Sequence, residues 1–464
     1  MGKRGYNSIL KRRFNMKNTA PKQAASVENV FTLEGRVPLG KAIPFGMQHI
    51  LAMFVSNLAP IFLIVAAAQP ALAQTELAML LQHAMIAAGI ASLIQMYPIW
   101  RVGSGLPVIM GVSFTFVAVL SAVAAEHGYG AVVGCVMVGG VFEGCLGLTA
   151  KYWRKLITPI VAACVVTAIG ISLFTVGARS FGGGYNDDFG SWQNLLIAFV
   201  TLCSCLAWNI FAKGYLKQLN VLAGLVVGYI LAIFFGKVDL STIWDGRWLA
   251  LPKLMPFAPE FHLGSIISVC IIFLVSAAET IGDTTALCNG GLDRDITEKE
   301  ISGTLAIDGF GSFISSLFGT PPVTSFSQNV GLVNMTKVVN RFTISTGAIM
   351  MILAGFVPVI GNFFSSLPDC VLGGCTVMMF GSILASGIEM IAKAGFSQRN
   401  VTIISLAISI GGGFTTASEA DIWHIFPDAV QSVFAGNIVA VVFVIAILLD
   451  LVLPKEMGIK KEEA

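Results

Sequence analysis

The sequence predicts an all-α polytopic membrane protein with fourteen membrane-spanning segments. The 464 residues are 55% hydrophobic and only 12% charged, with a mean hydropathy of +0.81, whereas soluble domains contain roughly 25% charged residues. Apolar runs of about 20 residues, the length that spans a bilayer, follow one another along the chain. Lys and Arg fall mostly on one side of the membrane when these runs alternate in direction.

Short polar breaks separate the predicted segments and leave no room for a sizeable soluble domain. The first apolar run is too long for the core of a signal peptide, so it is the first span. The fourteen segments cover residues 43–68, 76–98, 104–122, 129–150, 157–176, 191–212, 219–236, 263–288, 300–319, 323–336, 342–364, 369–392, 400–416 and 430–453.

Charge asymmetry supports this count and predicts the orientation. With a cytoplasmic N-terminus, all but four of the 28 Lys and Arg lie inside, and the four outside are Arg179, Lys237, Arg247 and Lys253. The basic excess of the N-terminal tail, residues 1–42, then suits a cytoplasmic face and not a nucleic-acid-binding arm. The C-terminal tail, residues 454–464, is cytoplasmic too, and the cell membrane is the expected location.

Two of the segments are poor helices. The third contains GSGLPVIMGVSFTFV (Gly103–Val117), and the tenth contains GTPPVTSFSQNVGLV (Gly319–Val333). Proline removes a backbone donor and disfavours helix just before it, so each segment should enter the membrane extended and then turn helical. Irregular backbone at membrane depth is tolerated only where protein or a water-filled cavity covers it.

The chain also contains a weak internal repeat. Pro107 and Pro322 are 215 residues apart, and Cys164 and Cys375, each followed by a glycine six residues later, are 211 apart. This spacing indicates two units of seven spans, residues 43–236 and 263–453. Because seven is odd, the units are inverted in the membrane, and interrupted segments at matching places predict a substrate site near the midplane.

Ionisable residues inside spans are costly and therefore need a reason to be there. Glu279 and Asp283 are four residues apart, which places both carboxylates on one helical face. Two buried like charges cannot both ionise cheaply, so at least one should hold a proton, as a proton carrier requires. The alternative is a pair of structural hydrogen-bonding groups.

Other polar residues in the spans are more ambiguous. His49 could relay protons, although a supporting role is favoured, and Asp308 fits either a coupling or a structural role. Glu143 and His83 have no polar neighbours of obvious purpose and are expected to serve packing. Gln328 and Asn329, at the break of the tenth segment, offer amide donors and acceptors that match a purine dione, or else satisfy frayed backbone.

The nine cysteines lie mostly in apolar segments without the spacing of a metal site or a disulfide framework. We expect no metal, disulfide or cofactor. The sequence likewise lacks the nucleophile constellations of an enzyme.

At these positions the chain resembles the nucleobase-ascorbate transporter family, also called nucleobase-cation symporter 2. The family signature is an acidic or amide residue, Asn-x-Gly, four variable residues, Thr and commonly a basic residue, and it is matched by QNVGLVNMTK, Gln328–Lys337. Further matches are ETIGD at Glu279–Asp283, the Gln48-His49 pair, and GSGL at Gly103–Leu106 followed by Ser113 and Phe114. The resemblance extends from about residue 36 to 455.

The resemblance implies fourteen spans in two inverted sevens, a core domain, a gate domain formed by spans 5–7 and 12–14, and a homodimer. It implies that Glu279 and Gln328 bind the base, with backbone near Phe114 and the Ser113 side chain in the same pocket. Asp283 and Asp308 would correspond to carboxylates that activity requires, and His49 to a supporting residue.

The same resemblance favours a purine, xanthine or uric acid, taken up with protons. Uracil-type bacterial members have Glu at the position of Gln328 and His at that of Asp283. Xanthine-type relatives tend to have Asn where this chain has Ser113, and urate-type relatives a small Ser or Thr. A uracil or other nucleobase permease is the alternative within the family. An anion transporter of the related sulfate-permease fold would be expected to carry a soluble C-terminal domain, whereas this chain ends shortly after its last span.

Overall fold

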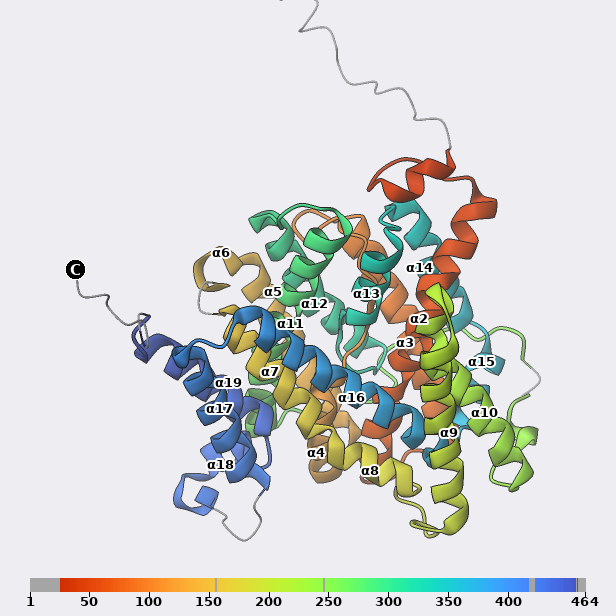
Figure 1. Ribbon diagram of the computed structural model, residues 1–464. Helices are drawn as coiled ribbons and strands as arrows, with labels where there is room; N and C mark the ends of the chain where they lie inside the picture. Colours follow the sequence, from red (N-terminus) through yellow and green to blue (C-terminus); the bar gives the residue numbers. More distant parts are fainter. Residues whose placement is uncertain (1–25, 155–156, 245–246, 417–421, 456, 458–464) are drawn as a thin grey trace, which may run out of the picture.

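The computed structural model is a helical bundle with one very short sheet (Figure 1). It describes residues 26–154, 157–244, 247–416, 422–455 and 457. The helices are α2 (Leu39–Ala67), α3 (Gln74–Met96), α4 (Val117–His127), α5 (Tyr129–Leu148), α6 (Ala150–Trp153), α7 (Pro159–Ser172), α8 (Phe174–Gly182), α9 (Trp192–Phe211), α10 (Asn220–Phe234), α11 (Leu263–Gly291), α12 (Glu298–Leu317), α13 (Ser327–Thr336), α14 (Arg341–Gly355), α15 (Pro358–Ser365), α16 (Asp369–Ala394), α17 (Gln398–Thr416), α18 (Asp428–Phe434) and α19 (Ile438–Val452). The strands are β1 (Met110–Val112) and β2 (Val323–Ser325), and the 3₁₀ helices are η1 (Val27–Phe31), η2 (Phe114–Phe116), η4 (Gly214–Leu219), η5 (Leu240–Thr242) and η7 (Ile422–Ile425).

In the described part of the chain, eight helical stretches are long and apolar enough to cross a membrane. A ninth is added if α14 and α15, which meet at a bend of 80°, count as one span. The protein is therefore a multi-pass membrane protein. Helix ends agree with the predicted segments to within a few residues, but some segments form short or broken helices, such as α18 and α19 in the predicted span 430–453.

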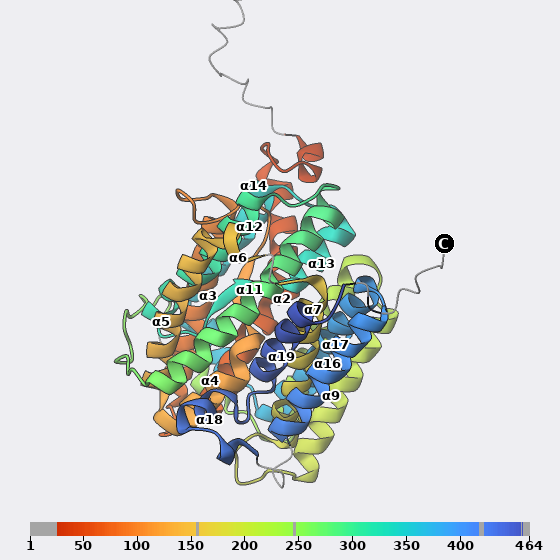
Figure 2. The same ribbon diagram turned by 90° about the vertical axis from the view of Figure 1, so that its left-hand side faces the viewer.

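The two interrupted segments are extended and then helical, as predicted, and they pair with each other. Strands β1 and β2 are antiparallel, with Met110 opposite Ser325 and Val112 opposite Val323. A helix begins just after each strand, η2 and α4 after β1 and α13 after β2. Because the strands run in opposite directions, α4 and α13 extend away from the sheet on opposite sides of it (Figures 1 and 2).

Side chains from neighbouring helices satisfy the free backbone of the strands. The Val112 amide donates to Asn57 Oδ1 of α2 at 2.8 Å, and the Met110 amide donates to Ser92 Oγ of α3 at 2.8 Å. On β2, the Val323 amide donates to Ser312 Oγ of α12 at 3.1 Å. Nonhelical backbone therefore keeps its hydrogen bonds at membrane depth, where water cannot supply them.

The helices pack in two groups. In one, α5 packs on α11 and α12, and α14 packs on α2 and α3; in the other, α16 packs on α7, α8 and α9, and α17 packs on α19. Figure 2 shows α3, α5 and α12 on one side of the molecule and α9, α16, α17 and α19 on the other. The paired strands belong to the first group, through contacts with α2, α3, α11 and α12.

The predicted cytoplasmic tails lie largely outside the described residues, which begin at Ser26 and include only 454, 455 and 457 of the C-terminal tail. The first α-helix, α2, starts at Leu39, three residues before the predicted end of the N-terminal tail at residue 42.

Candidate functional site

Most of the predicted site residues lie around the paired strands, where two helices begin and α11 passes beside β2 and η2. The unpaired amides at a helix N-terminus carry partial positive charge and favour an acceptor or anionic group. Two such ends, those of η2 and α13, flank the sheet. The arrangement is typical of a substrate site formed by discontinuous membrane helices.

Glu279 lies on α11, half-buried, with its carboxylate held by Thr115. The Thr115 hydroxyl donates to Glu279 Oε2 at 2.6 Å. Thr115 lies in η2, directly after Phe114, so the start of one broken segment is fixed to the α11 carboxylate. Thr115 was not predicted from the sequence, because a single threonine in an apolar run carries no distinctive signal.

Asp283 and Asp308 belong to one hydrogen-bonded network of hydroxyl groups. Asp283 Oδ2 accepts from Ser325 Oγ at 2.9 Å and from Ser327 Oγ at 3.0 Å. The Thr280 hydroxyl donates to Asp308 Oδ2 and lies 3.1 Å from Ser325 Oγ. Two hydroxyl groups in contact with each other therefore lie between a half-buried carboxylate and a fully buried one on α12.

Gln328 lies in the first turn of α13 and is half-buried. Ser113 and Phe114 lie at the matching place of the other broken segment. The Ser113 amide donates to the Pro322 carbonyl at 3.0 Å, and its hydroxyl accepts from the Thr115 amide at 3.3 Å as the cap of η2. The structure thus brings Ser113, Phe114, Glu279 and Gln328 to the two ends of the same short sheet.

Asn329 was expected to contact the substrate, but its amide is occupied by the protein. Its side chain is 0% exposed. Its Oδ1 accepts from the Ile109 amide at 3.1 Å, and its Nδ2 lies 2.8 Å from His49 Nδ1. Since Asn329 Nδ2 can only donate, His49 Nδ1 accepts this bond. Asn329 therefore holds the backbone just before β1 against α2, and His49 supports it from within α2.

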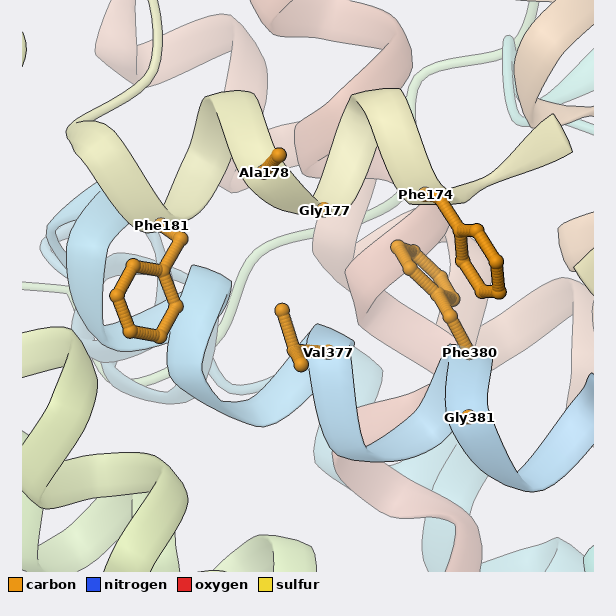
Figure 3. A pocket seen from close by; sticks show the side chains of 7 residues that line it. All are labelled: Phe174, Gly177, Ala178, Phe181, Val377, Phe380 and Gly381. Carbon is orange, nitrogen blue, oxygen red and sulfur yellow. The ribbon is translucent and has the colours of Figure 1, made fainter. Parts of the chain in front are cut away.

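An apolar cavity of about 480 Å³ lies between α8 and α16 (Figure 3). Phe380 lines it, next to Phe174 at one end, while Phe181 lies at the other end. The Phe380 ring also meets Phe114 edge-on, with ring centroids 5.6 Å apart. The cavity has no carboxylate in its lining, so it is not the polar site, but Phe380 and Phe114 join the two regions.

The two polar residues without a predicted role have different surroundings. The Lys253 amide donates to His83 Nε2 at 3.1 Å, which leaves His83 Nδ1 to donate to the Phe318 carbonyl at 2.7 Å. His83 therefore fixes the loop before α11 to α3 and to the end of α12. Glu143 is fully buried on α5, and neither of its carboxylate oxygens has a hydrogen-bond partner among the described residues.

The described residues contain no group of three or more His, Cys, Asp or Glu that could hold a metal ion. The nine cysteines are free thiols.

Comparison with known proteins identifies the family. Residues 40–420 match the sequence profile of a permease family. The xanthine permease XanQ of Escherichia coli is 32% identical over 446 residues, which cover 93% of this chain and 95% of XanQ. The nucleobase transporter PlUacP of Paenibacillus larvae is 34% identical over 412 residues, which cover 86% of this chain and 92% of PlUacP.

The chain belongs to the nucleobase-ascorbate transporter family. The xanthine permease of Bacillus subtilis is a further relative, 33% identical over 418 residues. These relatives are permeases and not enzymes. The resemblance predicted from QNVGLVNMTK and ETIGD is thereby confirmed.

Solved structures of more distant transporters share the fold. The murine Slc26a9 anion transporter in its inward-facing state aligns with a TM-score of 0.62 at 9% identity, covering 96% of this chain and 74% of that protein. The transmembrane domain of the cyanobacterial bicarbonate transporter BicA aligns with a TM-score of 0.53 at 15% identity. The alignment covers 89% of this chain and 97% of the BicA domain. At such low identity the likeness concerns the fold alone.

The buried, hydrogen-bonded amide of Asn329 should contribute more to stability than the partly exposed amide of its neighbour Gln328. We predict that Asn329→Ala lowers the stability of the folded protein by about 1–3 kcal/mol, because the Ile109 amide and His49 lose their partner. Thermal unfolding of the purified protein in detergent measures this. Gln328→Ala is the matched control, an adjacent half-exposed amide that should leave the unfolding temperature unchanged. Equal unfolding temperatures for both variants would contradict the assignment.

Proposed function

We propose that this family member is a symporter that imports a purine base, xanthine or uric acid, together with protons by alternating access. The observation that carries the proposal is the hydroxyl network that links half-buried Asp283 of α11 to buried Asp308 at the break before α13. Glu279, one turn before Asp283 on α11, is held by Thr115 at the other break. A substrate bound at Glu279 would thereby lie beside groups that can store a proton.

Recognition of the base is assigned to Glu279 and Gln328. A purine dione presents alternating N–H and C=O groups; a carboxylate accepts from the former, and an amide can both donate and accept. The two side chains come from different elements, α11 and α13, and both are half-buried. Phe114, buried at the start of η2, would contact the face of the base, with Ser113 at its edge.

Asn329 is proposed to position the site and not to bind the base. It fixes the chain before β1 through Ile109, and His49 orients its amide. Relatives named as xanthine permeases and a nucleobase transporter support the substrate class.

Proton coupling is proposed for Asp283 and Asp308, next to Glu279. Asp283 and Glu279 are close enough to repel each other, and Asp308 interacts electrostatically with both. Three carboxylates in a membrane interior cannot all be ionised cheaply. Binding of a base to Glu279 would change the charge that the other two experience and thus the number of protons they hold.

We further propose fourteen spans in two inverted repeats, residues 43–236 and 263–453. The packing supports this symmetry, because a contact within the first repeat recurs within the second, and a contact between the repeats occurs twice. The pair α9 and α10 corresponds to α17 and α19, and α2 with α14 corresponds to α11 with α5. The group containing β1 and β2 would be the core domain and the group containing α7 to α10, α16, α17 and α19 the gate domain.

A homodimer in the cell membrane, with both termini cytoplasmic, completes the proposal and rests on the family resemblance and the charge asymmetry. Anion transport, the function named for the structural neighbours, is less well supported at the site. An anion would meet the carboxylates of Glu279, Asp283 and Asp308. For monoanionic urate, an accompanying proton would compensate this repulsion.

Glu279→Gln tests the proposal directly. The substitution keeps the shape of the side chain but removes its charge and its titration, so we expect active accumulation of radiolabelled xanthine to be abolished in cells that lack their own carriers. Exposed Glu389→Gln on α16, which loses only a surface ion pair with Lys393, should accumulate xanthine like the wild type. Full proton-dependent accumulation by Glu279→Gln would refute the assignment.

Ser113→Asn tests selectivity between purines. Urate has one more ring oxygen than xanthine, so a larger side chain at the edge of the pocket should exclude urate by overlap. Asparagine also caps helices well, so η2 should stay intact. We predict that urate uptake falls about tenfold, equivalent to about 1.4 kcal/mol, with little change for xanthine.

Uptake of both labelled purines in parallel provides the internal control for Ser113→Asn. Equal loss of both would mean that Ser113 is structural, and no loss of either would place it outside the pocket.

A further inference from the structure

Glu143 is an acidic residue of α5 for which neither the substrate nor the fold gives an evident use. Its side chain is 0% exposed, and both carboxylate oxygens lack a hydrogen-bond partner in the described part of the chain. Asp308 on α12 is equally buried, and its Oδ1 likewise has no partner among the described residues. Orphaned acceptors of this kind are rare in native proteins and call for an explanation.

The two carboxylates belong to backbone segments in direct contact. A Cβ atom placed on Gly309 would lie 1.9 Å from the Gly144 amide nitrogen and 2.6 Å from the Glu143 carbonyl carbon. Glycines at 144 and 309 therefore let α5 and α12 approach until the residues preceding them, Glu143 and Asp308, are neighbours. The two groups interact electrostatically.

Packing does not require an acid here. A leucine or methionine of similar size would fill the space without burying oxygen atoms, and such replacements of buried charges are often neutral or stabilising. An isolated charge at this depth costs about 2.5–3.5 kcal/mol or more. A proton shared between Glu143 and Asp308 removes one charge of the pair and gives an orphaned oxygen a donor.

We propose that Glu143 is a proton-holding residue of the transport cycle, which accepts the coupled proton from Asp308. This rests on the proton coupling proposed above. In the step, the O–H bond of the Asp308 carboxylic acid breaks and an O–H bond forms on the Glu143 carboxylate, so the pair keeps one proton and one negative charge. The route then runs from Asp283 through Ser325, Thr280 and Asp308 to Glu143.

Glu143 and Asp308 both lie near the predicted inner face of the membrane. Glu143 lies five residues before the end of α5 at Leu148, about 8 Å along the helix axis. Charge asymmetry predicts that this end is cytoplasmic. The elements packed against α5 carry further titratable groups: Glu298, Lys299, Glu300 and Asp308 on α12, Cys270, Glu279, Asp283 and Cys288 on α11, and Glu126 and His127 at the end of α4. Among them, Asp308 belongs to the segment in direct contact with Glu143. A Cβ atom placed on Gly147 would lie 2.3 Å from the Ala306 amide nitrogen, so the antiparallel contact of α5 with α12 puts Glu143 and Asp308 at nearly the same level, close to the inner end of α5.

The test compares wild type, Glu143→Gln, Glu143→Asp and the surface control Glu389→Gln in proteoliposomes. Glu143→Gln should bind xanthine and exchange internal for external xanthine at rates near those of the wild type. Its accumulation driven by a pH gradient should fall at least about tenfold, and the pH dependence of its uptake should flatten. Glu143→Asp, which keeps a titratable group, should recover accumulation with a displaced pH profile.

Each other outcome overturns the inference. Wild-type accumulation and pH profile in Glu143→Gln would show that no coupled proton resides there. Parallel loss of exchange, binding and accumulation, or failure of both variants to fold, would make Glu143 a packing residue. If the wild type itself shows no proton-driven accumulation, the proposed symport is wrong. The wild-type vesicles alone give this result, so it can be distinguished from a failure of the Glu143 proposal.

Discussion

The structure depends on satisfying nonhelical backbone inside a membrane. The two broken segments can stay extended because β1 and β2 pair with each other and because Asn57, Ser92, Asn329 and Ser312 supply the hydrogen bonds that the pair leaves open. This arrangement brings two helix N-termini to the two ends of one short sheet. It also places Ser325 of β2 beside Asp283 and Thr280 of α11, so one of the paired strands takes part in the proposed chemistry.

Much of the fold follows from local sequence signals. Apolar runs located the spans, and Pro107 and Pro322 located the breaks, because a proline limits the backbone wherever it occurs. The pairing of β1 with β2 could not be predicted in this way, since it joins residues more than 200 positions apart and depends on how the surrounding helices pack. The 80° bend between α14 and α15 likewise leaves a weak signal, a Pro358 that lies inside an apolar run.

The candidate site was predictable where a residue type is unusual in its setting. Glu279, Asp283 and Asp308 stand out because acids are rare in apolar segments, and their spacing indicated a shared helical face. Thr115, Thr280 and Ser325 were not predicted, because hydroxyl residues are common in membrane helices. Their role depends on hydrogen-bond partners that the sequence does not reveal. Asn329 was singled out from the sequence as a substrate contact, whereas its hydrogen bond with His49 could not be predicted, because the two residues are 280 positions apart.

In the proposed mechanism, substrate entry and proton movement are one process at this carboxylate network. Purified protein in vesicles loaded with a pH-sensitive dye, without any initial gradient, tests it most directly. Adding xanthine outside should acidify the interior of the vesicles, and Glu279→Gln vesicles should show no such change. Xanthine entry without acidification, or entry driven by a sodium gradient in place of protons, would contradict the account.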